Sequence, residues 1–110
     1  MISWEDFENV ELRIGTIIEV NEFPEARRPA YKLKVDFGPE VGIRKSSAQI
    51  TDLYNPELLV GKQVLAVTNF PPKQIGKFMS ECLVTGIKND EGAVTLVGPD
   101  HHVSNGQRLM

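Results

Sequence analysis

The stretch NPELLVG, residues 55–61, indicates one short helical turn between two blocks of strand-forming sequence. Asn55 is a favourable N-cap, Pro56 suits the first helical position, and Gly61 is a common residue just beyond a helix end. We therefore expect a helix from Pro56 to Leu59. Its position along the chain is informative, because small β-barrels differ in where a helix interrupts the order of their strands.

Three strands are predicted on the N-terminal side of this turn. Residues 12–21 and 31–37 alternate between apolar and polar side chains, and residues 41–48 form a third, more polar run. Gly15 suggests a bulge or a tight bend within the first strand. Residues 23–29 contain two prolines and are expected to form the loop between the first two strands.

Two further strands are predicted on the C-terminal side. Residues 64–68 are almost continuously apolar, as in a strand buried on both faces, and residues 79–87 form a fifth strand. Residues 89–92 are a hairpin loop that leads into residues 94–97, and a last extended piece surrounds residues 103–109. Five strands with a helix between the third and the fourth are the order of the five-stranded Greek-key oligonucleotide-binding (OB) barrel, which we expect here. An SH3-like barrel is the alternative.

The chain is expected to be one all-β domain with short helices, because 110 residues suffice for a single modest core. Residues 1–11 are predicted to hold an N-terminal helix, residues 12–97 the barrel, and residues 98–110 a C-terminal extension. The helix would place Trp4, Phe7 and Val10 on one apolar face, which must pack on the domain or on a partner. This face and the C-terminal extension are therefore candidates for a dimer contact.

Composition argues against several classes of protein. No apolar run approaches the roughly 20 residues of a membrane-spanning helix, so no membrane insertion is expected. The acidic N-terminus does not resemble a secretory signal and Cys82 is the one cysteine, which favours a cytoplasmic protein. His101 and His102 are adjacent, neither is near Cys82 in sequence, and no glycine-rich phosphate loop is present. We therefore expect no enzyme, no metal and no cofactor.

The net charge of −3 conceals an uneven distribution. Residues 1–26 hold seven acids and one base, whereas residues 27–77 hold nine bases and four acids. A basic surface formed by the middle segment could follow a phosphate backbone, and the alternative is that these charges are solvated strand faces. The bases in question are Arg27, Arg28, Lys32, Lys34, Arg44, Lys45, Lys73 and Lys77, and the aromatic residues that could stack on nucleic-acid bases, if exposed, are Tyr31, Phe70 and Phe78.

Two predicted loops carry apolar residues. These residues can pack back on the domain, or they can rim a hydrophobic groove for an extended peptide. Prolines would keep such a groove preformed, because their φ angle is fixed. The peptide-binding hypothesis concerns Phe23, Pro24, Phe70, Pro71 and Pro72.

Several strings resemble the tRNA-binding domain family over nearly the whole chain. They are LRIGTI (12–17), VDFG (35–38), LLVGK (58–62) and SECL (80–83). The family includes the C-terminal domain of many methionyl-tRNA synthetases and small free-standing tRNA-binding proteins. Within the family, the chain resembles the CsaA branch of protein-export chaperones, through the strings FPEAR (23–27), KSSAQIT (45–51) and NFPPKQI (69–75).

This resemblance implies an OB fold, a homodimer, and an ATP-independent chaperone that binds unfolded or pre-secretory polypeptides. It also implies a capacity to bind tRNA, with the export machinery as a further candidate partner. The alternative is a structure-specific tRNA-binding protein without a chaperone role. Asn69, Lys73 and Ser80 match positions of the family's motifs, and with the basic residues the tRNA-binding candidates are Asn69, Lys73, Ser80, Lys32, Arg27, Arg44 and Lys77.

Overall fold

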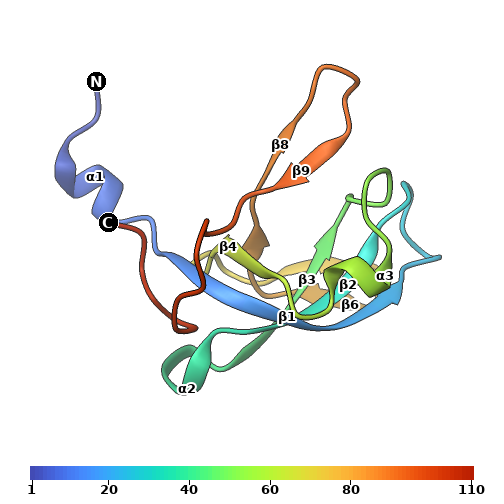
Figure 1. The fold of residues 1–110 in the computed structure, drawn as a ribbon, viewed down its shortest axis with the longest axis horizontal. Helices are drawn as coiled ribbons and strands as arrows, with labels where there is room; N and C mark the ends of the chain where they lie inside the picture. The colour runs from blue at the N-terminus through green and yellow to red at the C-terminus, as the bar shows by residue number, and fades with distance from the viewer.

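The computed structural model describes residues 1–110, in which a curved antiparallel sheet closes almost completely into a barrel (Figure 1). The strand order is β3-β2-β1-β4-β7. The strands are β1 (Leu12–Glu22), β2 (Tyr31–Asp36), β3 (Ile43–Ala48), β4 (Gln63–Val67) and β7 (Leu83–Val84). Helix α3 (Pro56–Leu59) lies between β3 and β4 along the chain, and the Asn55 side chain caps it. The predicted OB-fold barrel is confirmed.

The seam of the barrel lies between β3 and the segment that leads into β7. The Glu81 N–H donates to the Lys45 carbonyl at 2.7 Å, and the Glu81 carboxylate accepts from the Lys45 N–H at 2.9 Å. The buried Ser46 hydroxyl donates to the Cys82 carbonyl at 3.0 Å. One backbone hydrogen bond and several side-chain bonds therefore close the seam, whereas regular ladders join the other neighbouring strands.

The core lies inside the barrel, where β1 and β2 approach each other closely. Val35 and Phe37 are completely buried, and a Cβ atom added at Gly15 would lie 2.6 Å from Val35 and 2.7 Å from Phe37. Gly15 is therefore required because there is no space for a side chain. Of the two features predicted at Gly15, a bulge or a tight bend, the bulge lies elsewhere, since the register between β1 and β2 shifts between Ile17 and Glu19.

The predicted continuous fifth strand over residues 79–87 is wrong. It is divided into β6 (Phe78–Ser80), β7 and β8 (Gly86–Lys88), and β8 pairs with β9 (Val94–Leu96) in the expected hairpin. The break has a physical reason: residues 81 and 82 bond across the seam to β3 instead of continuing a ladder.

A second hairpin was not predicted. Strand β5 (Lys73–Ile75) pairs with β6 directly after the two prolines that indicated a loop. Gly76 and Lys77 form its two-residue turn, with Gly76 at a φ of +61°. The third strand also starts later than predicted, because the short helix α2 (Gly38–Val41) precedes it.

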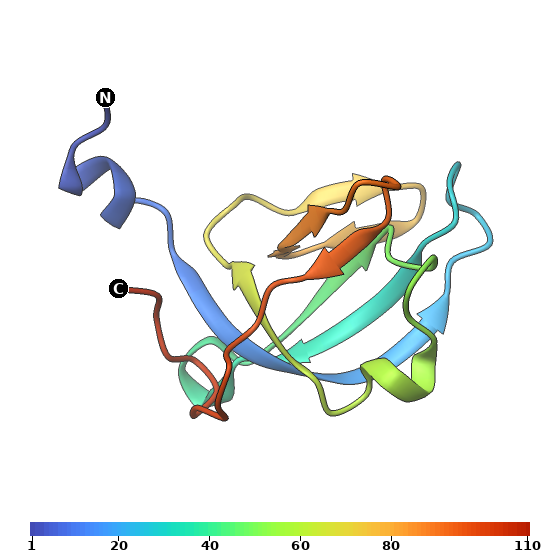
Figure 2. The same cartoon turned by 45° about the horizontal axis from the view of Figure 1, so that its top comes forward.

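Helix α1 (Trp4–Glu8) stands clear of the barrel, and the C-terminal segment ends on the same side of the molecule (Figures 1 and 2). Ser3 and Asp6 form the predicted capping box. On the apolar face of the helix, Trp4 is 84% exposed, whereas Phe7 is partly buried. The extended piece predicted near the C-terminus is reduced to one bridge, between Arg13 and Arg108. None of the helices is long and apolar enough to cross a membrane.

Candidate functional site

An apolar hollow of about 640 Å³ lies beside the loop that follows β4, within the size range of small-molecule and peptide pockets. Phe70 and Leu83 line it and are both about half exposed, at 54% and 50%. Pro71 and Pro72 restrict the backbone between Phe70 and β5. The other lining residues are Lys73, Gln74, Ser80 and Cys82.

A second hollow of about 540 Å³ continues from the first, because Lys73, Ser80, Cys82 and Leu83 line both. Its apolar walls come from the end of β3, from β5 and β7, and from β9, and they consist of Ala48, Ile50, Ile75, Val84, Val94 and Leu96. We call the two hollows together the apolar groove. Its charged lining residues are lysines, and no carboxylate lines it.

The two loops of the peptide-binding hypothesis do not form one surface. Phe23 is only 5% exposed, and its ring centroid lies 5.4 Å from that of Phe78. Pro24 lines a separate hollow of about 260 Å³ with Pro29. The structure therefore places Phe70, but not Phe23, where a ligand can reach it.

Two lysines cover the pair of Phe23, which is buried, and Phe78, which is partly buried. The Lys32 ammonium lies 5.4 Å from the centroid of Phe23, and the Lys45 ammonium lies 5.5 Å from the centroid of Phe78. Lys45 is also the ladder partner of Lys34 on the neighbouring strand, and Lys34 pairs with Glu19 at 3.4 Å. Because side chains alternate along a strand, these lysines share the outer face of β2 and β3.

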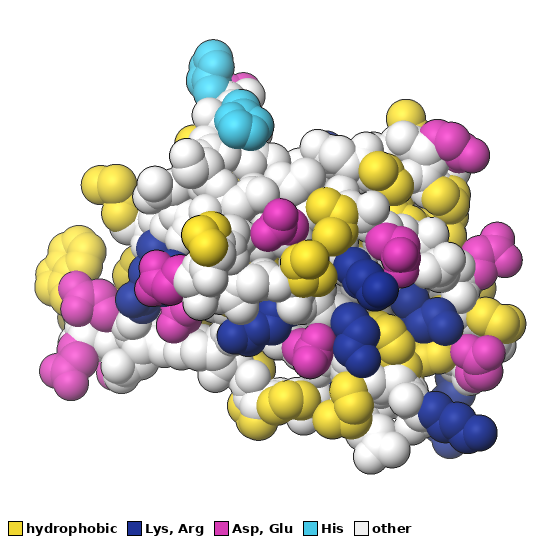
Figure 3. Space-filling view, turned by 90° about the horizontal axis from the view of Figure 1, so that it is seen from below, with side chains coloured by type: hydrophobic (Ala, Val, Ile, Leu, Met, Phe, Trp, Pro, Cys, Tyr) yellow, Lys and Arg dark blue, Asp and Glu magenta, His cyan; other side chains and the backbone are white.

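The remaining basic candidates occupy different environments. Lys73 and Ser80 are cross-strand partners in the β5–β6 hairpin, Lys77 lies at its turn, and Arg27 is exposed in the loop after β1. Arg44 differs from these residues, because its guanidinium donates to the Thr68 carbonyl at 2.9 Å. Figure 3 shows Lys and Arg side chains gathered mainly away from the N-terminal helix, with acidic side chains between them. We call Lys32, Lys34, Lys45, Lys73, Lys77 and Arg27 the basic surface.

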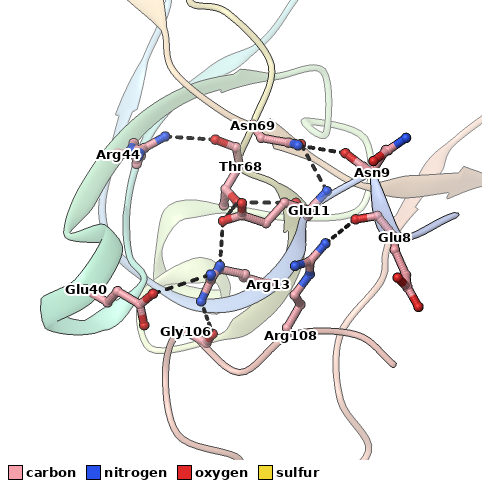
Figure 4. A network of polar contacts seen from close by, with 10 residues as sticks. All are labelled: Glu8, Asn9, Glu11, Arg13, Glu40, Arg44, Thr68, Asn69, Gly106 and Arg108. Carbon is pink, nitrogen blue, oxygen red and sulfur yellow. Dashed lines mark hydrogen bonds and ion pairs between the residues drawn. The ribbon is translucent and has the colours of Figure 1, made fainter. Parts of the chain in front are cut away.

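Asn69 has a structural role that its sequence context did not indicate (Figure 4). Its amide nitrogen donates to the Asn9 carbonyl at 2.8 Å, and its amide oxygen accepts from the Glu11 N–H at 3.0 Å. The Arg108 guanidinium donates to the Glu8 carbonyl nearby. These bonds fix the segment between α1 and β1 against the end of β4, so the Asn69 amide is engaged within the chain.

Glu11 is the acidic centre of the same network. Hydrogen bonds from the Arg13 side chain at 2.6 Å and from the Thr68 hydroxyl at 2.9 Å hold the pKa of the Glu11 carboxyl below its ordinary value. Arg13 also donates to the Gly106 carbonyl at 2.9 Å. A lowered carboxyl pKa stabilises the fold above the unfolded-state pKa, and this contribution is lost as the pH falls through the lower folded-state value.

Glu11→Gln is therefore expected to lower the free energy of unfolding at pH 7 by about 1 kcal/mol, and the difference from the wild type should shrink below about pH 4. Urea unfolding at pH 7 and pH 3 measures both quantities. Glu25→Gln is the matched control, because Glu25 is an exposed loop residue without an ion pair. A difference that stays constant with pH would show that the ionised carboxylate contributes nothing.

Cys82 lines the apolar groove but is only 5% exposed. Burial raises the pKa of its thiol to about 11, so the thiolate that a nucleophile requires is scarce at neutral pH. His101 is exposed and its imidazole lies 3.3 Å from the Asp100 carboxylate. Nothing in this geometry pairs a histidine with the thiol.

The family model described as a putative tRNA binding domain matches residues 12–108, so the chain belongs to the tRNA-binding domain family. Over its whole length it is similar to the crystal structures of two CsaA chaperones. That from Bacillus anthracis is 49% identical with a TM-score of 0.93, covering 100% of this chain and 99% of that one. That from Picrophilus torridus is 46% identical with a TM-score of 0.94, and both chains are covered completely. The predicted resemblance to the CsaA branch is confirmed.

The chain also matches part of a longer enzyme. The methionine–tRNA ligase of Thermococcus kodakarensis is 37% identical over 108 residues, which are 98% of this chain and 14% of the ligase. The chain thus spans about one seventh of the length of the curated relatives it matches.

Several residues of the groove were not identified from the sequence. Ile75, Val94 and Leu96 are ordinary apolar strand residues, and Ile50 lies just beyond β3. They share one surface only because three distant segments meet. The one available signal was Gly76-Lys77 between two short β-prone runs, which is typical of a two-residue hairpin. That hairpin brings β5 and β6 to the groove.

Proposed function

We propose that this protein is a non-catalytic, ATP-independent chaperone that holds apolar segments of unfolded or pre-secretory polypeptides in the apolar groove and also binds tRNA on the basic surface. The observation that carries the proposal is the groove, where Phe70 and Leu83 expose large apolar side chains beside a hairpin that two prolines precede. An apolar hollow of this kind favours the side chains that an unfolded chain exposes. The similarity of the whole chain to CsaA chaperone structures supports the same function.

A tRNA-binding protein without a chaperone role is the second candidate function. The basic surface favours it, because lysines project together from the outer face of β2 and β3 and from the β5–β6 hairpin. OB folds commonly bind nucleic acid on this region of the barrel. Lys73 belongs to both the basic surface and the groove, so the two ligands would meet there.

The functional form is proposed to be a cytoplasmic homodimer that works with the export machinery. Trp4 on α1 and Met110 at the C-terminus are exposed on the same side of the barrel, and a second copy would bury them. A two-fold dimer carries two grooves, so one long client could bind both and gain avidity. Sedimentation equilibrium measures whether the protein is a dimer.

Phe70→Ala is expected to weaken the binding of an unfolded polypeptide about tenfold to hundredfold, because burying a phenylalanine side chain contributes about 1.5–3 kcal/mol. Fluorescence anisotropy with a labelled apolar peptide measures the affinity. Leu58→Ala is the control, since Leu58 is similarly exposed but lies on α3 away from the groove. Unchanged affinity in folded Phe70→Ala would exclude the groove as the binding site.

Competition separates the two candidate functions. The labelled peptide is bound first and then challenged with tRNA at several salt concentrations. Displacement at low salt alone indicates overlapping sites for an apolar and an anionic ligand, because phosphate contacts weaken with salt. tRNA binding with no peptide binding under any condition would favour the second candidate.

A further inference from the structure

One edge of strand β3 borders the barrel seam, where the hydrogen bonds at Lys45 and Ser46 are not continued by a ladder at Ser47. Strand β3 is the last strand in the order β3-β2-β1-β4-β7, so one of its two edges, the open edge, lacks a ladder partner. On that edge Lys45 is bonded to Glu81 through both its N–H and its carbonyl. Alternate residues of a strand direct these groups to the same edge, so Ser47 presents its own N–H and carbonyl there.

The open edge lies against the apolar groove. Ser47, Ala48, Gln49 and Ile50 all line the 540 Å³ hollow, and Val84 and Val94 are among its apolar walls. Strand β3 ends at Ala48, so Ser47 is the residue of the strand edge that borders this hollow, and Gln49 and Ile50 continue the wall beyond the strand. Unpaired backbone groups of a strand are therefore adjacent to space for apolar side chains.

We propose that the polypeptide ligand binds as an added β-strand, pairing its backbone with the open edge of β3 at Ser47 and directing alternate apolar side chains into the groove. This inference rests on the proposed chaperone function and specifies its binding mode. Backbone hydrogen bonds are available from every polypeptide, so strand addition binds clients without a common sequence. The apolar walls then select segments that a folded protein would bury.

The same geometry discriminates between the two ligand classes. A polypeptide presents N–H and C=O groups at a strand's spacing, whereas an RNA backbone presents only oxygen acceptors and ribose hydroxyls. At the open edge, Ser47 offers its carbonyl as an acceptor and its N–H as a donor. The walls of the groove beside this edge are largely apolar. The edge therefore favours an extended peptide over RNA, and tRNA is expected to use the lysines instead.

Backbone methylation of the ligand tests the binding mode. The probe is a labelled peptide in which leucine and serine alternate. When it binds as a strand, its leucine side chains all lie on the face toward the apolar groove and its serine side chains on the other face. One variant is N-methylated at its leucines and another at its serines. An added strand directs only one of these sets of N–H groups to β3, so one variant should lose about tenfold or more in affinity while the other stays within about twofold.

Equal effects of the two methylations, whether small or large, would overturn the proposal. If the unmethylated peptide does not bind, the chaperone function itself fails, so the two failures are distinguishable. Ser47→Pro provides the complementary test, because it removes an N–H that no ladder uses, and Ser47→Ala retains that N–H as the matched control. A Ser47→Pro variant that folds and binds the peptide with wild-type affinity would contradict strand addition. If the variant does not fold, the comparison of the two methylated peptides still tests strand addition.

Discussion

Phe37→Ala is expected to lower the free energy of unfolding by about 3–5 kcal/mol, a large part of the total stability of a domain of this size. Phe37 is completely buried, and its ring lies against Gly15 on the neighbouring strand. Because Gly15 has no side chain that could move into the space, truncation leaves a cavity at the centre of the barrel. Urea denaturation followed by circular dichroism measures the loss.

The same substitution at Phe70 is the control for this prediction. Phe70 is 54% exposed at the rim of the groove, so Phe70→Ala should change the free energy of unfolding by no more than about 0.5 kcal/mol. Similar losses at the two positions would mean that the Phe70 loop belongs to the core, which would contradict both the exposed groove and its proposed role.

The affinity for tRNA is expected to fall about 10²–10³-fold between 50 and 200 mM salt. Five phosphate contacts would give a logarithmic slope of about −3.5 to −4.5, because each contact releases most of one counterion. The basic surface supplies about this number, since Lys34 is paired with Glu19 and Arg44 is engaged with Thr68. Filter binding or anisotropy over a salt series measures the slope.

Substitution of single lysines locates the contact surface. Lys73→Ala should reduce the magnitude of the slope by about one, and Lys62→Ala, outside the basic surface, should leave it unchanged. An affinity that does not depend on salt would exclude phosphate contacts and with them the basic surface as the RNA site.

Local signals in the sequence were sufficient for much of the fold. Asn55 and Pro56 predicted α3, and Ser3 with Asp6 predicted the capped start of α1, because capping depends on residues only three positions apart. The alternation in residues 31–37 likewise indicated β2. The divided strand after residue 78 was not predictable in this way, since Glu81 and Cys82 bond to β3, which is more than thirty residues away in sequence.

The candidate site could be predicted only in part. The apolar character of Phe70, Pro71 and Pro72 in a predicted loop indicated a ligand surface, and the three residues line one hollow. The same signal at Phe23 was misleading, because Phe23 is buried against Phe78. The side chain of the polar candidate Asn69 forms hydrogen bonds within the chain, to the backbone of Asn9 and Glu11 between α1 and β1.

By itself, the sequence determined the class of the barrel, the N-terminal caps of α1 and α3, the hairpin between β8 and β9, and membership of the tRNA-binding domain family. Only the tertiary structure decided which of two similar phenylalanines is exposed, which edge of β3 is left open at Ser47, and which distant residues share the groove. The physical reason is that helix caps and strand alternation depend on neighbours along the chain. Burial and free hydrogen-bonding edges depend on how segments far apart in sequence pack together.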